Sequence, residues 1–275
     1  MNSLKRIFIV GYLMSQMGSV IYSIYKLITG SSVNSFGPPL LSAISITLFI
    51  GSLMLFQKTA RTSRYLWYLW PTTILGCFLS YWYSNEALPM GLSSVSVLGL
   101  ILYVFWYSNL SKNEGRLKIG QVIPSFELRD LNSNVIQSST FLGHKNLFLF
   151  FRGNWCPLCM AQIKEVQAHY QKIIGSGCQI NLISPQSQSH TQSLAHKLQV
   201  DFKFYRDESS VAAIALGIKA PKSLPLGMEL LGFDSDTVLP TIIVTDDAGK
   251  VIYFDVADNY RVRPGTEEFL KFLNI

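Results

Sequence analysis

The most informative run in this 275-residue chain is Phe-Arg-Gly-Asn-Trp-Cys-Pro-Leu-Cys, which occupies positions 151–159. It overlaps the end of the apolar run 146–151, which is typical of a strand buried on both faces of a sheet. It leads into residues 157–174, where apolar residues recur with the period of a helix. The two cysteines of this Cys-x-x-Cys motif, Cys156 and Cys159, therefore fall where a buried strand turns into a helix.

The first cysteine of the motif is expected to be the reactive one. At a helix N-terminus, unpaired backbone N–H groups and the positive end of the helix dipole stabilise a thiolate. Cys156 is therefore the candidate nucleophile, with the lower pKa of the two thiols, and Cys159 is the candidate resolving thiol. Arg152 can add a positive charge nearby. Pro157 suits the first helical turn, where its missing N–H is not needed.

Two other interpretations of the cysteine pair are open. The pair could be half of a zinc site, but two more ligands are then needed, and only Cys77, Cys178 and four scattered histidines remain. It could also be two inert buried thiols. The context Trp155-Cys156-Pro157 at a strand–helix junction favours a redox pair instead. No metal and no cofactor is expected, and Cys178 is expected to be an apolar packing residue.

The rest of the second half alternates strands and helices. Strands are expected at 126–131, 146–151, 179–184, 202–205, 241–245 and 251–254, and helices at 157–174, 191–198, 209–216 and 266–273. Residues 218–238 look irregular and are interpreted as an insertion. This order predicts a central mixed sheet that is covered on both faces.

A proline precedes one of the predicted strands. In Leu239-Pro240-Thr241 the proline blocks ladder pairing at the start of the strand. The Leu239–Pro240 bond is either cis, packed beside the cysteine pair with a backbone edge open to a substrate, or an ordinary trans bond in a turn.

The first 112 residues have a different composition. Only 15% of the chain is charged, against about 25% in ordinary soluble proteins. Residues 1–112 hold seven of the 23 Lys and Arg residues and one of the 17 Asp and Glu residues. About 20 apolar residues suffice for a helix to cross the hydrocarbon core of a bilayer. We predict an all-α transmembrane bundle in 1–112, with four spans at about 7–27, 39–57, 65–84 and 88–109, and a second domain in 113–275.

The basic residues of the first half predict its orientation. Lys and Arg lie at the N-terminus, in the loop 58–64 and after the last span, whereas the loops 30–38 and 85–87 carry none. Because basic loops stay in the cytoplasm, both termini and the second domain of this multi-pass cell-membrane protein are predicted to be cytoplasmic. A cleaved signal peptide is the alternative for the first span, but no small-residue cleavage site follows it.

The spans offer little chemistry of their own. Their interiors carry no Asp, Glu, Lys, Arg or His, and Cys77 is their one thiol, whereas thiol–disulfide exchange needs a second thiol to resolve the mixed disulfide. We interpret the bundle as an anchor in the lipid bilayer; a site for a lipid, a quinone or a partner helix is the alternative. The second half is neutral overall, so no nucleic-acid partner is expected.

Residues from about 118 to 275 resemble the peroxiredoxin-like branch of the thioredoxin superfamily, the alkyl hydroperoxide reductase/thiol-specific antioxidant proteins. The resemblance rests on the run 151–159, on Leu-Pro-Thr-Ile-Ile-Val at 239–244, and on Asp-Asn-Tyr-Arg-Val-Arg-Pro at 258–264. It implies an α/β thioredoxin-like fold, Cys156 as the peroxidatic or attacking thiol, and Pro240 as a cis proline. Typical members carry Pro and Thr or Ser where this chain has Leu149 and Gly153, and a second active-site Arg where it has Pro240.

The resemblance and the motif together predict a membrane-anchored thiol oxidoreductase with antioxidant activity. It would reduce peroxides or disulfides with electrons from a cellular thiol such as thioredoxin or glutathione. Cys156 and Cys159 would be catalytic, and Arg152, Trp155, Pro157 and Pro240 would support them. The alternatives are a protein disulfide reductase that serves a membrane partner and a non-catalytic redox sensor.

Overall fold

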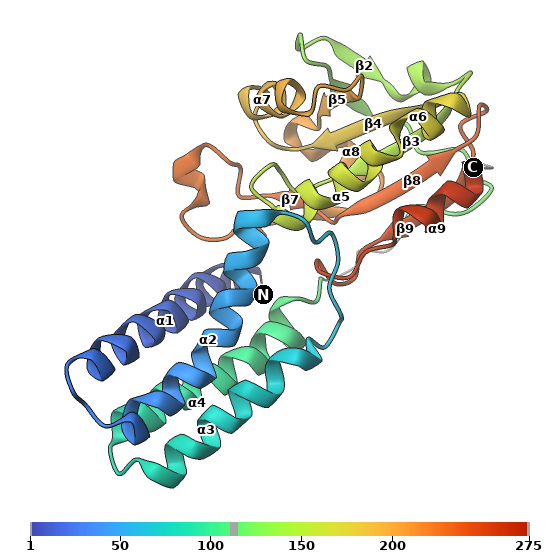
Figure 1. Ribbon diagram of the computed structural model, residues 1–275. Helices are drawn as coiled ribbons and strands as arrows, with labels where there is room; N and C mark the ends of the chain where they lie inside the picture. The colour runs from blue at the N-terminus through green and yellow to red at the C-terminus, as the bar shows by residue number, and fades with distance from the viewer. Residues whose placement is uncertain (1, 111–114, 274–275) are drawn as a thin grey trace. The chain divides into compact units, whose positions relative to one another are not determined.

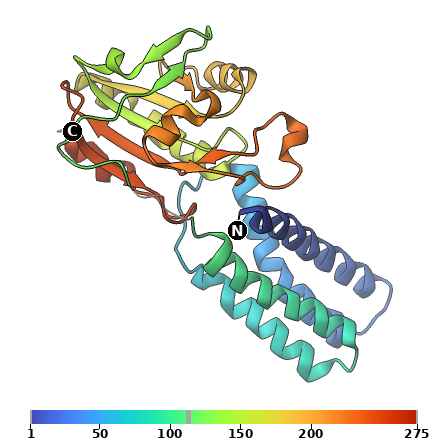
Figure 2. The same cartoon turned by 180° about the vertical axis from the view of Figure 1, so that it is seen from behind.

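The computed structural model describes residues 2–110 and 115–273, and the chain divides into two compact units. The first unit comprises Ser3–Gln57 and Thr62–Asn109, and the second comprises Lys58–Arg61 and Leu110–Ile275. Figures 1 and 2 show the helices of the first unit and the sheet of the second from opposite sides.

The first unit consists of helices joined by short loops. Its elements are α1 (Asn2–Ile28), α2 (Val33–Phe56), a 3-10 turn η1 (Trp67–Leu69), α3 (Trp70–Tyr83), α4 (Ala87–Leu102) and a π-helical turn η2 (Tyr103–Tyr107). Helices α2 and α3 approach closely at Gly76, where a Cβ would lie 2.6 Å from the carbonyl oxygen of Pro38. Small residues permit this kind of contact between apolar helices.

Three of the helices in the described residues are long and apolar enough to cross a membrane. They cover Ser3–Ile28, Val33–Phe56 and Ala87–Tyr107. The segment predicted as a span at 65–84 contains α3, which has 14 residues and is therefore about 21 Å long, short of the roughly 30 Å of a hydrocarbon core. Helix α2 begins six residues before the predicted start of the second span, because Ser32 caps it and Pro38 and Pro39 lie inside it.

The second unit contains a mixed sheet, which within the described residues has seven strands in the order β2-β1-β5-β4-β3-β8-β9. The strands are β1 (Glu127–Arg129), β2 (Val135–Gln137), β3 (Lys145–Phe150), β4 (Cys178–Ser184), β5 (Lys203–Arg206), β8 (Thr241–Thr245) and β9 (Val251–Val256). Strands β3, β4 and β5 are parallel to one another, and β8 runs antiparallel to β3 with Phe150 opposite Thr241. The carboxyl end of β3 and the start of β8 therefore meet at one edge of the sheet.

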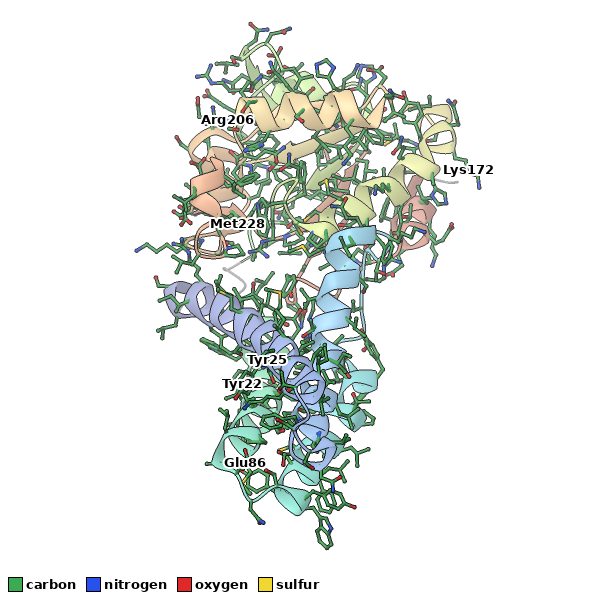
Figure 3. The ribbon with its side chains drawn as sticks, turned by 60° about the vertical axis from the view of Figure 1, so that its left-hand side comes forward. Tyr22, Tyr25, Glu86, Lys172, Arg206 and Met228 are labelled. Carbon is green, nitrogen blue, oxygen red and sulfur yellow. The ribbon has the colours of Figure 1, made fainter. Side chains whose placement is uncertain are left out.

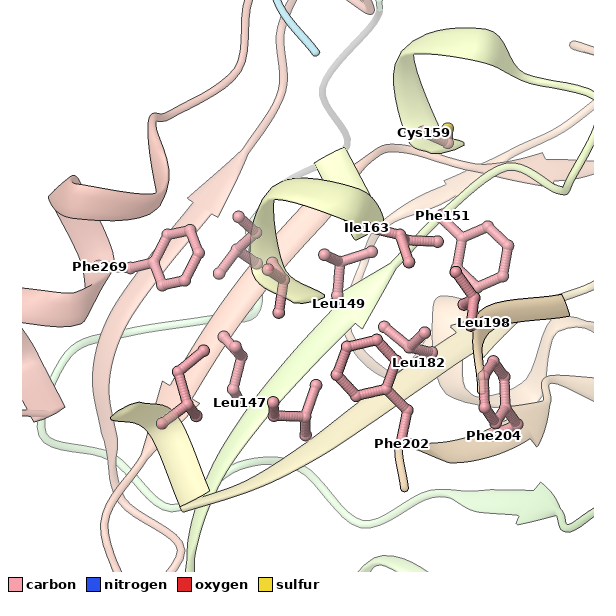
Figure 4. Close-up of a cluster of buried hydrophobic side chains, with 14 of the residues drawn as sticks. Leu147, Leu149, Phe151, Cys159, Ile163, Leu182, Leu198, Phe202, Phe204 and Phe269 are labelled. Atoms are coloured by element: carbon pink, nitrogen blue, oxygen red, sulfur yellow. The ribbon is translucent and has the colours of Figure 1, made fainter. Parts of the chain in front are cut away.

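Helices cover both faces of this sheet, as the sequence predicts. On one face lie α5 (Pro157–Ala168), α6 (Tyr170–Gly175), α7 (Gln188–Leu198) and α9 (Thr266–Leu270), packed on the apolar cluster of Figure 4. On the other face lie α8 (Val211–Ala215) and the 3-10 turn η3 (Ser138–Phe141), packed on a second cluster that includes Phe148 and Phe150. Alternate side chains of β3 enter the two clusters, which is why the strand is apolar at nearly every position.

Several details differ from the sequence expectation; the helix expected at 209–216, for example, is confined to Val211–Ala215, because Ser209 and Ser210 have positive φ angles. The helix expected at 157–174 is divided into α5 and α6 at His169, whose backbone leaves the helical conformation. The short edge strand β2 was not expected, because it has three residues and none of them is fully buried.

The segment 221–236 is the irregular part of the second unit. It lies between β6 (Lys219–Ala220) and β7 (Thr237–Val238), which pair with each other in a separate two-stranded ribbon. The segment contains one 3-10 turn, η5 (Met228–Leu231). The expected insertion is therefore the long connection between two paired strands.

Candidate active site

The Cys-x-x-Cys motif lies at the carboxyl end of β3 and the N-terminus of α5. Cys156 is the N-cap residue of α5, and its sulfur accepts a hydrogen bond from the backbone N–H of Cys159 at 3.4 Å. Pro157 is at the first helical position, where it removes no helical hydrogen bond. The local geometry is that predicted from the motif: the first thiol caps the helix and the second lies within its first turn.

The two sulfur atoms lie close together in the interior of the unit. They are 2.6 Å apart, and neither cysteine forms a disulfide in the structure. The exposed fractions of Cys156 and Cys159 are 2% and 0%. The pair can therefore form a disulfide without a backbone rearrangement, and both cysteines are buried.

A buried arginine that the sequence analysis did not select lies against both sulfurs. The Nη2 atom of Arg263 is 3.7 Å from the sulfur of Cys156 and 3.4 Å from the sulfur of Cys159. Its Nη1 atom donates to the side-chain oxygen of Gln162 on α5, and its Nε atom donates to the carbonyl oxygen of Tyr260. With an exposed fraction of 5%, this guanidinium is a fixed positive charge at the cysteine pair.

The electrostatics favour one negative charge shared by the two sulfurs. Burial opposes ionisation of Cys159, but hydrogen bonding from the Cys156 thiol and the charge of Arg263 outweigh it and lower the pKa of Cys159 well below its ordinary value. Burial, followed by the hydrogen bond and the charge of Cys159, raises the pKa of Cys156. The sequence analysis expects the lower pKa for Cys156, whereas in the structure Cys159 has it, because Arg263 lies closer to Cys159. Two thiolates 2.6 Å apart would repel each other, so ionisation of Cys159 opposes ionisation of Cys156.

Arg152 and Trp155 lie together beside the pair. The Arg152 guanidinium is 4.9 Å from the centre of the Trp155 ring and 5.8 Å from that of Tyr260. It also donates to the carbonyl oxygen of Ser223 in the segment 221–236. Arg152 therefore ties the motif to that segment, whereas the guanidinium in contact with the sulfurs belongs to Arg263.

A glycine is required in the turn before Cys156. Gly153 has φ +146°, and a Cβ there would lie 2.6 Å from the indole nitrogen of Trp155. Its carbonyl oxygen accepts the backbone N–H of Cys156 at 3.1 Å. The Thr or Ser hydroxyl that typical peroxiredoxins place here is excluded by the Trp155 ring.

Pro240 lies at the same edge of the sheet, but its peptide bond is not the one the resemblance implies. No cis peptide bond occurs in the described residues, so the Leu239–Pro240 bond is trans, and the expected cis proline is wrong. The N–H of Leu239 donates to the carbonyl oxygen of Ile218, and the carbonyl of Pro240 accepts from Ala257. This backbone is already hydrogen-bonded within the unit.

A glutamine from the neighbouring strand holds the loop before the cysteines. Gln186 follows β4, and its Oε1 atom accepts the backbone N–H of Asn154 at 2.8 Å. The residue is 2% exposed, and its side-chain Nε2 atom has no hydrogen-bond partner in the described structure. Gln186 was not expected from the sequence, because its place beside β3 follows only from the strand order.

The remaining candidate ligands are not assembled into a metal site. Cys178 begins β4, where burial raises its pKa to about 12, which fits the expected packing role. Across residues 2–110 and 115–273, no three His, Cys, Asp or Glu side chains are grouped as metal ligands would be.

Comparison with known proteins identifies the class of this domain. Residues 119–254 match the AhpC/TSA family. The thiol-disulfide oxidoreductase ResA of Bacillus cereus is 26% identical over 174 residues, which cover 63% of this chain and 87% of that protein. ResA of Bacillus anthracis is 24% identical over 155 residues, which cover 56% of this chain and 77% of that protein. The second unit is therefore a thiol oxidoreductase domain of the thioredoxin superfamily.

The solved structures that match this chain include peroxiredoxins. Peroxidoxin BcpB from Mycobacterium tuberculosis is 18% identical, with a TM-score of 0.48, and the match covers 58% of this chain and 97% of that one. AhpC from Enterococcus faecalis is 16% identical, with a TM-score of 0.47 and coverage of 57% and 91%. The peroxiredoxin-like character of the domain rests on the AhpC/TSA match of residues 119–254.

Proposed function

We propose that this chain is a membrane-anchored thiol oxidoreductase that reduces peroxides or disulfides through Cys156 and Cys159. The observation that carries the proposal is the pair of sulfurs 2.6 Å apart at the N-terminus of α5, with the buried guanidinium of Arg263 against both. This arrangement supplies a thiolate, a second thiol to resolve the product, and a cation to stabilise the negative charge.

The proposed cycle begins with attack by Cys156. Since the sulfurs are so close, the proton they share can pass to Cys159 as the substrate approaches, which leaves the thiolate on Cys156, the N-cap residue of α5. With a peroxide, the Cys156 sulfur takes the terminal oxygen and becomes a sulfenic acid, while the rest of the peroxide leaves as an alcohol or water. With a disulfide, the same thiolate forms a mixed disulfide and one substrate thiolate leaves.

Cys159 completes the turnover. Its sulfur attacks Cys156, forms the Cys156–Cys159 disulfide, and releases water or the second substrate thiol. A cellular dithiol such as thioredoxin, or two molecules of glutathione, then reduces the disulfide to the two thiols. Trp155 and Arg152 support the turn before Cys156, Pro157 starts the helix, and Pro240 fixes the start of β8 at the same edge of the sheet.

The substrate is the point on which two candidate functions differ. A peroxidase activity is supported by the AhpC/TSA match, and a disulfide reductase activity by the similarity to ResA. The exclusion of a hydroxyl at Gly153 favours the second candidate, because that hydroxyl helps to hold the peroxide in typical peroxiredoxins.

The rates of the two reactions decide between the candidates. The purified full chain should be mixed with hydrogen peroxide, with an alkyl hydroperoxide and with a model protein disulfide, and the oxidation of Cys156 followed in each case. We expect reaction with at least one substrate class at a rate well above that of a free cysteine. Rates equal to that of free cysteine for all three substrates would contradict an enzymatic function and favour a redox sensor.

We propose that residues 1–112 anchor the domain 113–275 in the cell membrane with the cysteines in the cytoplasm. The apolar helices and the basic residues at 5–6 and 58–64 support this arrangement. We expect a membrane-impermeant maleimide to leave Cys156 unlabelled in intact cells and to label it after the membrane is permeabilised and a reductant is added. Labelling in intact cells would place the domain outside the cytoplasm.

A further inference from the structure

The segment 221–236 carries an exposed apolar turn near its middle. Leu226, Leu230 and Leu231 have exposed fractions of 50%, 92% and 61%, and the 3-10 turn η5 that contains the last two has no buried residue. Figure 3 labels Met228 in the same turn. We name Leu226, Met228, Leu230 and Leu231 the apolar tip. Single exposed leucines are common, but a cluster at the end of one projecting segment indicates a contact surface.

A chain of contacts connects the apolar tip to the residue at which the chain enters the second unit. That residue is Leu110, whose N–H donates to the carbonyl oxygen of Asp258 at 2.7 Å. Two residues later, the ring of Tyr260 lies 5.8 Å from the guanidinium of Arg152. Arg152 in turn donates to Ser223, at the base of the segment that carries the tip. The entry point, the redox motif and the segment 221–236 are thus neighbours within the second unit.

The base of the same segment is fixed by aromatic contacts at the motif. The Phe233 ring stacks on His190 with centroids 4.1 Å apart and meets the Trp155 ring edge to face at 6.5 Å. The Nε2 atom of His190 also lies 3.1 Å from the carbonyl oxygen of Leu231. The tip therefore projects from a well-packed base and is not an unstructured end of a loop.

We propose that the apolar tip inserts into the interfacial region of the lipid bilayer. The proposal rests on the membrane anchoring described under the proposed function. The apolar helix Ala87–Tyr107 ends three residues before Leu110, a separation of at most about 11 Å along an extended chain, so a bilayer is the apolar surface that the second unit can always reach. Glu229 lies within the tip and Asp234 follows it, so burial of apolar side chains, and not attraction to anionic headgroups, would hold the tip there.

Quenching of tryptophan emission by brominated lipid tests the contact. The full chain is reconstituted in phosphatidylcholine vesicles with and without brominated phosphatidylcholine. The wild-type emission comes from five tryptophans, of which Trp67, Trp70, Trp82 and Trp106 lie in the helical unit, so its quenching reports the membrane anchoring itself. We expect the additional emission of Leu230→Trp to be quenched as well, and to the same extent when the vesicles contain phosphatidylglycerol.

A matched control is available at the opposite edge of the sheet. Leu142 is 48% exposed and precedes β3, whereas the motif follows that strand. The additional emission of Leu142→Trp should not be quenched, and adding Leu231→Asp to Leu230→Trp should reduce the quenching. If the wild-type emission is quenched but the additional emission of Leu230→Trp is not, the insertion of the tip is wrong while the membrane anchoring stands. A protein partner would then be the surface that the tip contacts. Unquenched wild-type emission would overturn the membrane anchoring, and this inference with it.

Discussion

Replacing Cys156 by serine is expected to abolish reduction of every substrate, with a loss of roughly a thousandfold or more. Serine keeps the helix cap but supplies no nucleophile at neutral pH, and Cys159 alone is buried beneath it with an exposed fraction of 0%. The loss should be measured as the rate of substrate reduction under saturating reductant. Cys178→Ala is the matched control, because this buried thiol begins a strand away from the motif, and it should retain the wild-type rate.

The companion variant Cys159→Ser should behave differently. The first attack by Cys156 should remain, but no thiol is then available to resolve the product. Mass spectrometry of the variant after one turnover should therefore detect a sulfenic acid with peroxide, or a trapped mixed disulfide with a protein substrate. If Cys156→Ser retains activity while Cys159→Ser loses it, the two roles are the reverse of those proposed, in line with the lowered pKa of Cys159.

Replacing Arg263 by methionine is expected to shift the pH dependence of the reaction upward. The guanidinium stabilises the thiolate form of the pair, so its removal raises the pKa of the first ionisation, by about one to three units for a charge at this distance. The rate near neutral pH should fall about tenfold or more, because fewer molecules carry a thiolate. Thiolate absorbance and the rate should be followed together as functions of pH.

Recovery of the rate at high pH distinguishes a raised thiol pKa from a failure of Arg263→Met to fold. At a pH above the new pKa, Arg263→Met should regain most of the wild-type rate, whereas a protein that fails to fold would not. Arg263→Lys keeps the positive charge, so the pKa of the first ionisation of the cysteine pair should remain close to that of the wild type. The surface control Arg129→Met removes an ion pair with Glu208 outside the site and should leave the pH dependence of the rate unchanged. An unchanged profile in Arg263→Met would contradict the role given to this arginine.

The sequence predicted those parts of the site that lie within one local run. Cys156, Cys159 and Pro157 are where the motif predicts, because a strand, a turn and a helix N-terminus are specified by neighbouring residues. The mixed sheet with two covered faces was also predicted, because β3 is apolar on both faces and strands alternate with helices.

Other parts depend on contacts that no local pattern contains. Arg263 is 104 residues from Cys159 and reaches it only because β9 lies at the sheet edge beside β8, which pairs with β3. The run 258–264 contributed to the family resemblance, and its two arginines, Arg261 and Arg263, were the available signal. Gln186 likewise depends on β4 lying next to β3. The bond before Pro240 is trans, and the backbone around it is hydrogen-bonded to Ile218 and Ala257, which lie outside the tripeptide 239–241.

The buried guanidinium of Arg263 also bears on the reduction potential of the cysteine pair. In the reduced state its charge is balanced by the thiolate, but formation of the Cys156–Cys159 disulfide removes that negative charge and leaves a buried cation without its partner. The reduced state is therefore favoured, so we expect the disulfide to be readily reduced by cellular dithiols, in the manner of oxidants whose thiolate form is stabilised. Each tenfold change in this equilibrium corresponds to about 30 mV for a two-electron couple. Equilibration of Arg263→Met with glutathione should accordingly give a lower potential than the wild type, so the arginine would favour reduction of the disulfide in the recycling step as well as ionisation of the thiol in the first attack.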